Sequence, residues 1–237
     1  MTVILVCSSN AAQAVARALA DVTGATPHTV DPDLPVEEYL LALSDPEVDF
    51  GVLALDRAGW EIAQDAGKPI VLVPNSLRPA DVPATIEHVL VPLDGTDEAA
   101  HAVAETVRLF RAAGTEIAVL HVFDRSTVPA SWDQAAHARS AWEEEFLARY
   151  CAPHLPGAPP ALTLRSGSPG ETVVDVAAEQ ADMIILGWSQ RLLPGRAQTV
   201  RKTVDAAPVP VMLIPVVSVP AVGRHRAGSA RLNGLNH

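Results

Sequence analysis

The sequence predicts an α/β protein in which parallel sheets are covered by helices. Short apolar runs of strand length alternate with longer amphipathic stretches along most of the chain, and this alternation is typical of repeated strand–helix units. The composition agrees, because aromatic residues make up only 4% of the 237 residues while hydrophobic residues make up 49%. A core built mainly from Val, Leu, Ile and Ala suits parallel strands that are buried on both faces.

The first part of the chain contains four predicted strands. They are expected at Val3–Cys7, Pro27–Val30, Phe50–Asp56 and Pro69–Pro74. The segment AAQAVARALADV after the first strand has a helical pattern, and Pro35 is well placed to begin a second helix. The segment NSLRPADVPATIE that follows is rich in proline and polar residues, so it predicts a linker.

The second part repeats this theme at greater length. Strands are expected at His88–Asp94, Glu116–Val122, Ala161–Gly167, and in the runs MIILG and PVMLIPV. After the first of them, a helix is predicted with Thr96 as its N-cap and Gly114 as its stop. In a later helix, Trp142, Phe146 and Tyr150 recur at i, i+4 and i+8, the stripe of a helix that packs on a core or on a partner.

The two parts resemble each other in order and in their ends. VILVCSSNAAQAVARALADVTGA can be laid beside VLVPLDGTDEAAHAVAETVRLFRAAGT, and DFGVLALD with GKPIVLVP parallels DMIILGWS with VPVMLIPV. This pattern predicts an internal repeat with a shorter first copy. We divide the chain into a reduced unit (1–76), a linker (77–87), a complete unit (88–217) and a tail (218–237). The tail has no periodicity and is expected to be disordered.

Charge and composition exclude several classes of function. A net charge of −11 argues against wholesale binding of nucleic acid or anionic membranes, which favour a basic surface. The opening MTVILVCSSN has no basic leader, and no apolar run is long enough to span a bilayer. Cys7 and Cys151 are the only cysteines, so neither a disulfide framework nor a thiolate metal cluster is expected. We expect a soluble, cytoplasmic protein.

The predicted fold also predicts where a ligand binds. Parallel strands joined by helical crossovers form a right-handed, helix-covered sheet. In such sheets ligands bind outside the carboxyl ends of the strands, at the point where the strand order reverses. The loops after Leu93, Val122 and Leu186 are therefore the candidate site.

The second unit, from about His88 to Val216, resembles the universal stress protein family. VLVPLDGTDEAAHA looks like that family's opening strand and helix, and LHV matches its second strand. RSGSPGETVVDVAAEQADMIILG resembles its third strand, helix and fourth strand, and APVPVMLIPV is similar to its closing strand. The resemblance implies a flavodoxin- or Rossmann-like fold. It also implies a role in stress response as a binding or signalling module that is not an enzyme.

The family's phosphate-binding pattern is incomplete in this sequence. Family members that bind ATP carry a glycine, two residues, a second glycine, nine residues, and then Gly followed by Ser or Thr. Gly187 supplies the first glycine, but Gln190 stands where the second belongs, and Val200-Arg201 stands where the last pair would fall. A glutamine side chain there would lie over the path of a phosphate, and valine cannot replace a glycine backbone. The nucleotide-binding loop is therefore predicted to be altered.

Basic residues stand where the glycines are missing. Loop shortening would let Gly195 take the last role, although Arg196 follows it in place of a small hydroxyl residue. Arg191, Arg201 and Lys202 lie in the same short stretch. One interpretation is an anion site in which arginine forks bind phosphate. The alternative, which the charge pattern favours, is a solvated helix face.

Three further residues match positions of the family's adenosine pocket. The resemblance implies that Pro92 and Asp94 line this pocket and that Val122 packs against the base. Asp94 could equally cap a turn, and Val122 could equally belong to the core. Ser189 in the altered loop completes the candidate set for nucleotide binding.

Catalytic motifs are absent from the sequence. No Walker loop occurs, and no Gly-x-Ser-x-Gly elbow surrounds Ser189. We therefore rank a non-enzymatic interaction module first, an ATP-, ADP- or AMP-binding sensor second, and a slow ATP hydrolase last. No metal or other cofactor is expected apart from a candidate adenine nucleotide. Because PVMLIPV is apolar and would end at a sheet edge, we expect either pairing of the two repeats or a homodimer through that edge.

Overall fold

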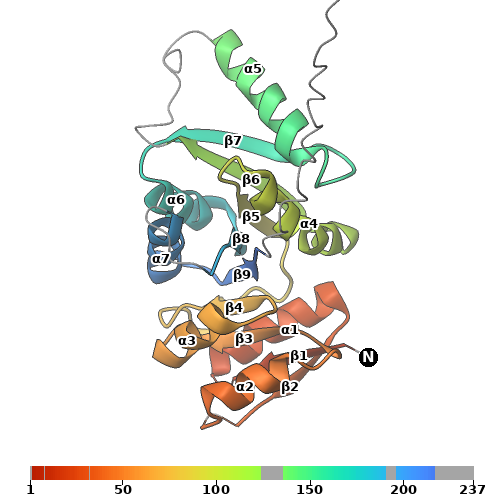
Figure 1. Ribbon diagram of the computed structural model, residues 1–237, viewed down its shortest axis with the longest axis vertical. Helices are drawn as coiled ribbons and strands as arrows, with labels where there is room; N and C mark the ends of the chain where they lie inside the picture. Colours follow the sequence, from red (N-terminus) through yellow and green to blue (C-terminus); the bar gives the residue numbers. More distant parts are fainter. Residues whose placement is uncertain (1, 8, 32, 124–135, 191–195, 217–237) are drawn as a thin grey trace, which may run out of the picture.

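The computed structural model describes residues 2–7, 9–31, 33–123, 136–190 and 196–216, with the backbone alone at 136–139, 196 and 197. The predicted tail (218–237) lies outside these residues. A single sheet carries nine strands in the order β2-β1-β3-β4-β9-β8-β5-β6-β7 (Figure 1). The strands are β1 (Val3–Val6), β2 (Thr26–Thr29), β3 (Val48–Ala54), β4 (Ile70–Val73), β5 (His88–Pro92), β6 (Glu116–Phe123), β7 (Ala161–Ser166), β8 (Met183–Trp188) and β9 (Val211–Pro215).

Helices cover both faces of the sheet. They are α1 (Asn10–Thr23), α2 (Val36–Leu43), α3 (Arg57–Asp65), the 3₁₀ turn η1 (Pro79–Asp81), α4 (Asp97–Ala112), α5 (Ala136–Phe146), its π-helical continuation η2 (Leu147–Cys151), α6 (Pro169–Gln180) and α7 (Arg196–Ala206). Helices α1 and α4 bury their apolar sides in one core. Helices α2, α3, α6 and α7 bury theirs in a second core on the other face. None of the helices in the described ranges is long and apolar enough to cross a membrane.

The side chains of the central strands alternate between these two cores. In β5, Val89 and Val91 enter the core beneath α1 and α4, while Leu90 enters the other. Ile184 and Ile185 in β8 divide in the same way. Successive side chains of a strand point to opposite faces, so a continuous apolar run is what a strand covered on both faces requires. The α/β fold predicted from these runs is thereby confirmed.

Local signals define the start and end of α4. The Thr96 hydroxyl accepts a hydrogen bond from the amide of Ala99 at 3.3 Å, which makes Thr96 the predicted N-cap. Two acidic residues follow in the first turn, where their negative charges interact favourably with the helix dipole. Gly114 adopts a left-handed conformation with φ of +91° directly after the helix, as its role as a stop requires.

One strand pair makes the sheet mixed rather than purely parallel. Strand β4 pairs with β9 in antiparallel fashion, with Ile70 opposite Leu213 and Leu72 opposite Val211. The other neighbouring strands of the described sheet pair in parallel. The sheet is therefore mixed with mostly parallel strands, and the two units share one continuous sheet. In Figure 1 the join lies between the orange strand β4 and the blue strand β9.

The closing strand of the second unit has no open edge. Strand β9 pairs with β8 on one side and with β4 on the other. Of the two expected contacts, pairing between the first and second parts of the chain is therefore the one that occurs, and the expected homodimer through this edge is wrong. Both strands bury nearly all their side chains. Their pairing also gives the backbone N–H and C=O groups along these edges hydrogen-bond partners.

The strand order of the two units corresponds. From the join outward, the first unit reads β4-β3-β1-β2 and the second reads β9-β8-β5-β6-β7. Strand β7, with the helix before it, has no counterpart in the first unit. This correspondence supports the interpretation of a shortened repeat, and the proposed unit boundaries remain a prediction.

Candidate functional site

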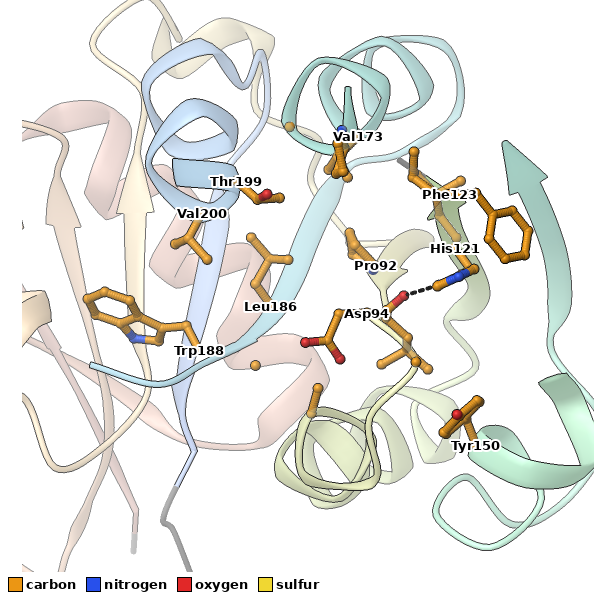
Figure 2. A pocket seen from close by; sticks show the side chains of 18 of the residues that line it. Pro92, Asp94, His121, Phe123, Tyr150, Val173, Leu186, Trp188, Thr199 and Val200 are labelled. Atoms are coloured by element: carbon orange, nitrogen blue, oxygen red, sulfur yellow. Dashed lines mark hydrogen bonds between the residues drawn. The ribbon is translucent and has the colours of Figure 1, made fainter. Parts of the chain in front are cut away.

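A cavity of about 770 Å³ opens at the carboxyl ends of β5, β6 and β8. This is the place that the sheet topology predicts, since β5 and β8 lead into connections on opposite sides of the sheet. Figure 2 shows side chains from both sides converging on the cavity. Those used below are Pro92, Asp94, Gly95, His121, Val122, Phe123, Trp142, Glu145, Phe146, Arg149, Tyr150, Gly170, Gly187, Trp188, Ser189, Thr199, Val200 and Lys202.

The loop after β5 forms the floor of the cavity. One carboxylate oxygen of Asp94 accepts hydrogen bonds from the amide and the hydroxyl of Thr96, at 3.0 Å and 2.6 Å. Asp94 thus shapes the turn into α4, the role that its residue type alone also allowed. Gly95 has φ of +78°, and a Cβ atom at this position would lie 3.4 Å from Cε1 of His121. The floor therefore lies directly against the histidine of the next strand.

His121 links the floor to the ring-lined side of the cavity. Its Nδ1 lies 2.8 Å from the carbonyl oxygen of Leu93, the bond that Figure 2 draws as a dashed line. A carbonyl only accepts, so Nδ1 carries a proton in this contact. Burial lowers the pKa of His121, although the Leu93 carbonyl and the nearby Asp94 carboxylate act in the opposite direction. The imidazole is therefore held as a neutral, planar ring.

His121 and four further rings form a cluster that we call the aromatic wall. Its members are His121, Phe123, Trp142, Phe146 and Tyr150. The ring centroid of His121 lies 4.6 Å from that of Phe123 and 4.7 Å from that of Phe146. The Phe123 and Trp142 centroids are 6.2 Å apart, and those of Phe146 and Tyr150 are 4.9 Å apart. These spacings fall in the range of favourable ring pairs. The wall gives the cavity a predominantly apolar side.

Part of this wall was visible in the sequence, but we interpreted it as a packing surface and not as part of a site. The stripe of Trp142, Phe146 and Tyr150 predicted a helix packed on a core or a partner. Phe146 does belong to the core, being only 7% exposed, yet all three rings also line the cavity. Phe146 and Trp142 contact His121 and Phe123 of β6. Such contacts depend on how the helix packs on the sheet, so spacing within the helix alone could not identify these rings as site residues.

On the opposite side, β8 approaches α4 closely. A Cβ atom at Gly187 would lie 3.1 Å from the carbonyl oxygen of Ala99. Close packing against α4 is thus sufficient to explain the glycine at this position, whether or not the loop binds a phosphate. The next residue, Trp188, is only 3% exposed and lines the cavity together with Ser189.

Two residues of the altered loop contact the first unit. The side-chain amide of Gln190 donates a hydrogen bond to the carbonyl oxygen of Ala66, at the end of α3. The guanidinium of Arg201 lies 5.8 Å from the ring centroid of Trp60 in the same helix. The Trp60 ring in turn lies 5.7 Å from that of Trp188. The expectation that Gln190 lies over a phosphate path therefore needs correction, because its amide is bound to the first unit.

Lys202 lines the cavity and is paired. Its ammonium group forms a salt bridge with the carboxylate of Glu171 in the first turn of α6. The hydrogen bond and charge of Lys202 lower the pKa of Glu171. The pair is about half exposed, so it contributes little to stability but does fix the direction of the lysine side chain.

The structure brings six of the predicted residues together around the cavity: Pro92, Asp94, Val122, Gly187, Ser189 and Lys202. Arg191 and Gly195 lie outside the described residues. Arg196 begins α7, with only its backbone described. Within the described ranges, no group of three or more His, Cys, Asp and Glu side chains could hold a metal ion.

The fold and the site together define an α/β protein with a ligand-sized cavity at the switch point of its sheet. Residues 85–215 match the model of the universal stress protein family. This match covers more than half of the chain, and the chain belongs to that family.

Solved structures agree on the fold. A universal stress protein from Archaeoglobus fulgidus DSM 4304 is 16% identical with a TM-score of 0.56, over 86% of this chain and 79% of its own. A putative universal stress protein from Pseudomonas aeruginosa UCBPP-PA14 is 16% identical with a TM-score of 0.57, over 90% and 82%. The functionally unknown protein PA1789 from P. aeruginosa PAO1 is 14% identical with a TM-score of 0.56, over the same shares. No curated protein sequence matches the chain.

Proposed function

We propose that this protein is a non-enzymatic binding or signalling module of the stress response, and that its cavity takes an adenosine-type ligand. The carrying observation is the cavity itself. Pro92, Asp94 and Val122, the residues that resemble the family's adenosine pocket, lie together on its lining. A cavity of about 770 Å³ is within the range of small-molecule sites.

The proposed mechanism is a change in partner contacts on ligand binding. A ligand that contacts the β5 loop, the aromatic wall and the β8 end would add contacts between these elements. It shifts the population of states by its differential affinity for them. The surfaces of the elements around the cavity would then be altered for a partner protein.

A second candidate is an ADP-, ATP- or AMP-binding sensor that uses the arginine-rich loop. It is favoured by one observation, the presence of Lys202 of α7 on the cavity lining. A cation attracts phosphate. A slow ATP hydrolase ranks last, because the sequence offers no evident catalytic base.

Thermal unfolding tests the proposal. The purified protein is heated with and without millimolar adenosine, AMP, ADP or ATP, the nucleotides with magnesium. A ligand present at about 100 times its dissociation constant adds roughly 2.7 kcal/mol to the stability of the folded state. A higher midpoint with at least one member of this series supports the proposal. Unchanged midpoints throughout the series would reject adenosine-type ligands.

A further inference from the structure

We infer that the cavity selects planar, uncharged ligands over nucleotides with charged phosphates, and that Glu171 sets this selectivity by holding Lys202. The inference rests on the proposed ligand-binding function and names the ligand class for the same cavity. Its basis is the distribution of rings and charges around the lining.

The aromatic wall favours a flat ligand. His121, Phe123, Phe146 and Tyr150 are joined by ring contacts, and Trp142 extends the wall beyond Phe123. Aromatic rings stack on the flat face of a base, and this contact does not depend on which base it is. On the other side, the ring of Trp188 and the side chain of Val200 are also largely buried. A planar, apolar body therefore has complementary surface on both sides of the cavity.

The described lining offers no surplus of positive charge. Its cations are Arg149 and Lys202, and its carboxylates are Asp94 and Glu145. The guanidinium of Arg149 lies 5.2 Å from the ring centroid of Tyr150. Lys202 is bound by Glu171. Each phosphate added to a ligand brings negative charge into a site whose cations already have partners.

The pairing of Lys202 follows from the packing of α6 on α7. A Cβ atom at Gly170 would lie 2.9 Å from Cβ of Lys202 and 3.2 Å from the carbonyl oxygen of Thr199. Glycine at this position thus permits a close approach of the two helices. The next residue, Glu171, lies in the first turn of α6 and reaches the ammonium group. Its carboxylate also occupies the positive end of the helix, where a phosphate would otherwise be attracted.

The first unit contacts two further polar side chains of this region. Arg201 stacks on Trp60, and Gln190 binds the carbonyl of Ala66. Neither is among the described residues that line the cavity. Among the described lining residues, Lys202 is the cation held by a carboxylate, so its partner Glu171 is the group expected to decide whether a phosphate is accepted.

The test is a titration of the full-length protein with adenosine, AMP and ATP, which share one base and differ in charge. Trp142 and Trp188 line the cavity, so binding is followed by their fluorescence. For the unaltered protein we expect adenosine to bind at least as tightly as AMP, and ATP to bind most weakly. Glu171→Gln frees Lys202 and should raise the affinity for AMP relative to adenosine by roughly fivefold.

Two further variants make the result specific. Glu179→Gln removes the same charge from an exposed position on the same helix, and it should leave the ratio of AMP to adenosine affinity unchanged. In the double variant Glu171→Gln/Lys202→Gln the gain for AMP should disappear, because the cation itself is gone.

The outcomes separate the two proposals. If ATP binds more tightly than adenosine, or if Glu171→Gln and Glu179→Gln give the same ratio, the selectivity inference is overturned while ligand binding stands. If none of the three probes binds to any variant, the proposed function fails and the inference falls with it.

Discussion

Replacing Trp60 with alanine tests the contact between the first unit and the cavity. The indole of Trp60 lies between the second unit's Trp188, at 5.7 Å, and Arg201, at 5.8 Å. Trp60→Ala removes both contacts at once, while the α3 helix keeps a residue of high helix propensity. We expect the variant to fold and to be measurably less stable.

The magnitude follows from the two contacts. A ring pair at this distance contributes about 0.5–1.5 kcal/mol beyond area burial. A cation over an indole at a partly exposed site adds about 0.5–1 kcal/mol. Together they predict a loss of at least about 1–2.5 kcal/mol in the free energy of unfolding, to which the lost burial of the indole adds. For a chain of this size these two contacts alone would lower the melting midpoint by about 2–10 °C.

A double-mutant cycle in urea isolates the Arg201 contribution. We expect Trp60→Ala and Arg201→Ala to show a coupling energy of about 0.5–1 kcal/mol. Arg57→Ala is the matched control, because Arg57 lies on the same helix as Trp60 with its side chain 92% exposed. It should change stability by less than about 0.5 kcal/mol. Additive effects of Trp60 and Arg201, or a Trp60→Ala loss no larger than that of Arg57→Ala, would refute the reasoning.

Three further predictions follow from the packing. Gly51→Ala should lower the free energy of unfolding by about 1–3 kcal/mol, because its Cβ atom would lie 2.4 Å from the hydroxyl oxygen of Tyr39. The control Gly67→Ala should lower it far less, because no atom lies within 4 Å of the added Cβ. Equal urea midpoints for the two variants would contradict this. Burial lowers the pKa of His121 below 6.5, so as pH falls through 6.5 the unfolded state takes up the proton first and stability declines. Replacement of His121 by Phe should flatten this decline between pH 7.5 and 5.5, and an unchanged slope would count against it. Burial raises the pKa of the Cys151 thiol to about 11, so at pH 8 mass spectrometry should show iodoacetamide labelling of Cys151 only after unfolding, and rapid labelling of the folded protein would disagree.

Much of the fold was predictable because its signals are local. Val89 and Leu90 belong to a continuous apolar run, which fits a strand covered on both faces. Thr96 is three residues before the amide that its hydroxyl caps, so the start of α4 can be identified from the sequence alone. Helix α3 was not among the predicted helices, and Gly59, a residue of low helix propensity, stands in its first turn. The structure explains that glycine, since a Cβ atom there would lie 2.2 Å from the carbonyl oxygen of Ala54.

The direction in which the two units pair was not predictable. An apolar closing strand indicates that its edge must be covered. Its sequence does not indicate which strand covers it, or whether the two strands run parallel or antiparallel. The register of Ile70 opposite Leu213 joins residues from the two halves of the chain. Such a contact depends on how both folded units fit together.

The same limit applied to the site. The loops after Leu93, Val122 and Leu186 were predicted from topology, which depends only on strand order. The orientation of Gln190 depends on Ala66, from which it is separated by 124 positions in the sequence. Counting against a family pattern identified Gln190 as unusual, but only the fold shows that its side chain is bound to another unit.

These contacts give the first unit a structural role at the cavity of the second. Helix α3 supplies Trp60 and the carbonyl of Ala66, and both contact the region between β8 and α7. Trp188 lines the cavity on one side and packs on Trp60 on the other. Because interiors are closely packed, a shift of α3 cannot leave Trp188 undisturbed. A ligand that contacts Trp188 is therefore coupled to the join of the two units, and a fluorescence change on ligand binding should be smaller in Trp60→Ala than in the unaltered protein.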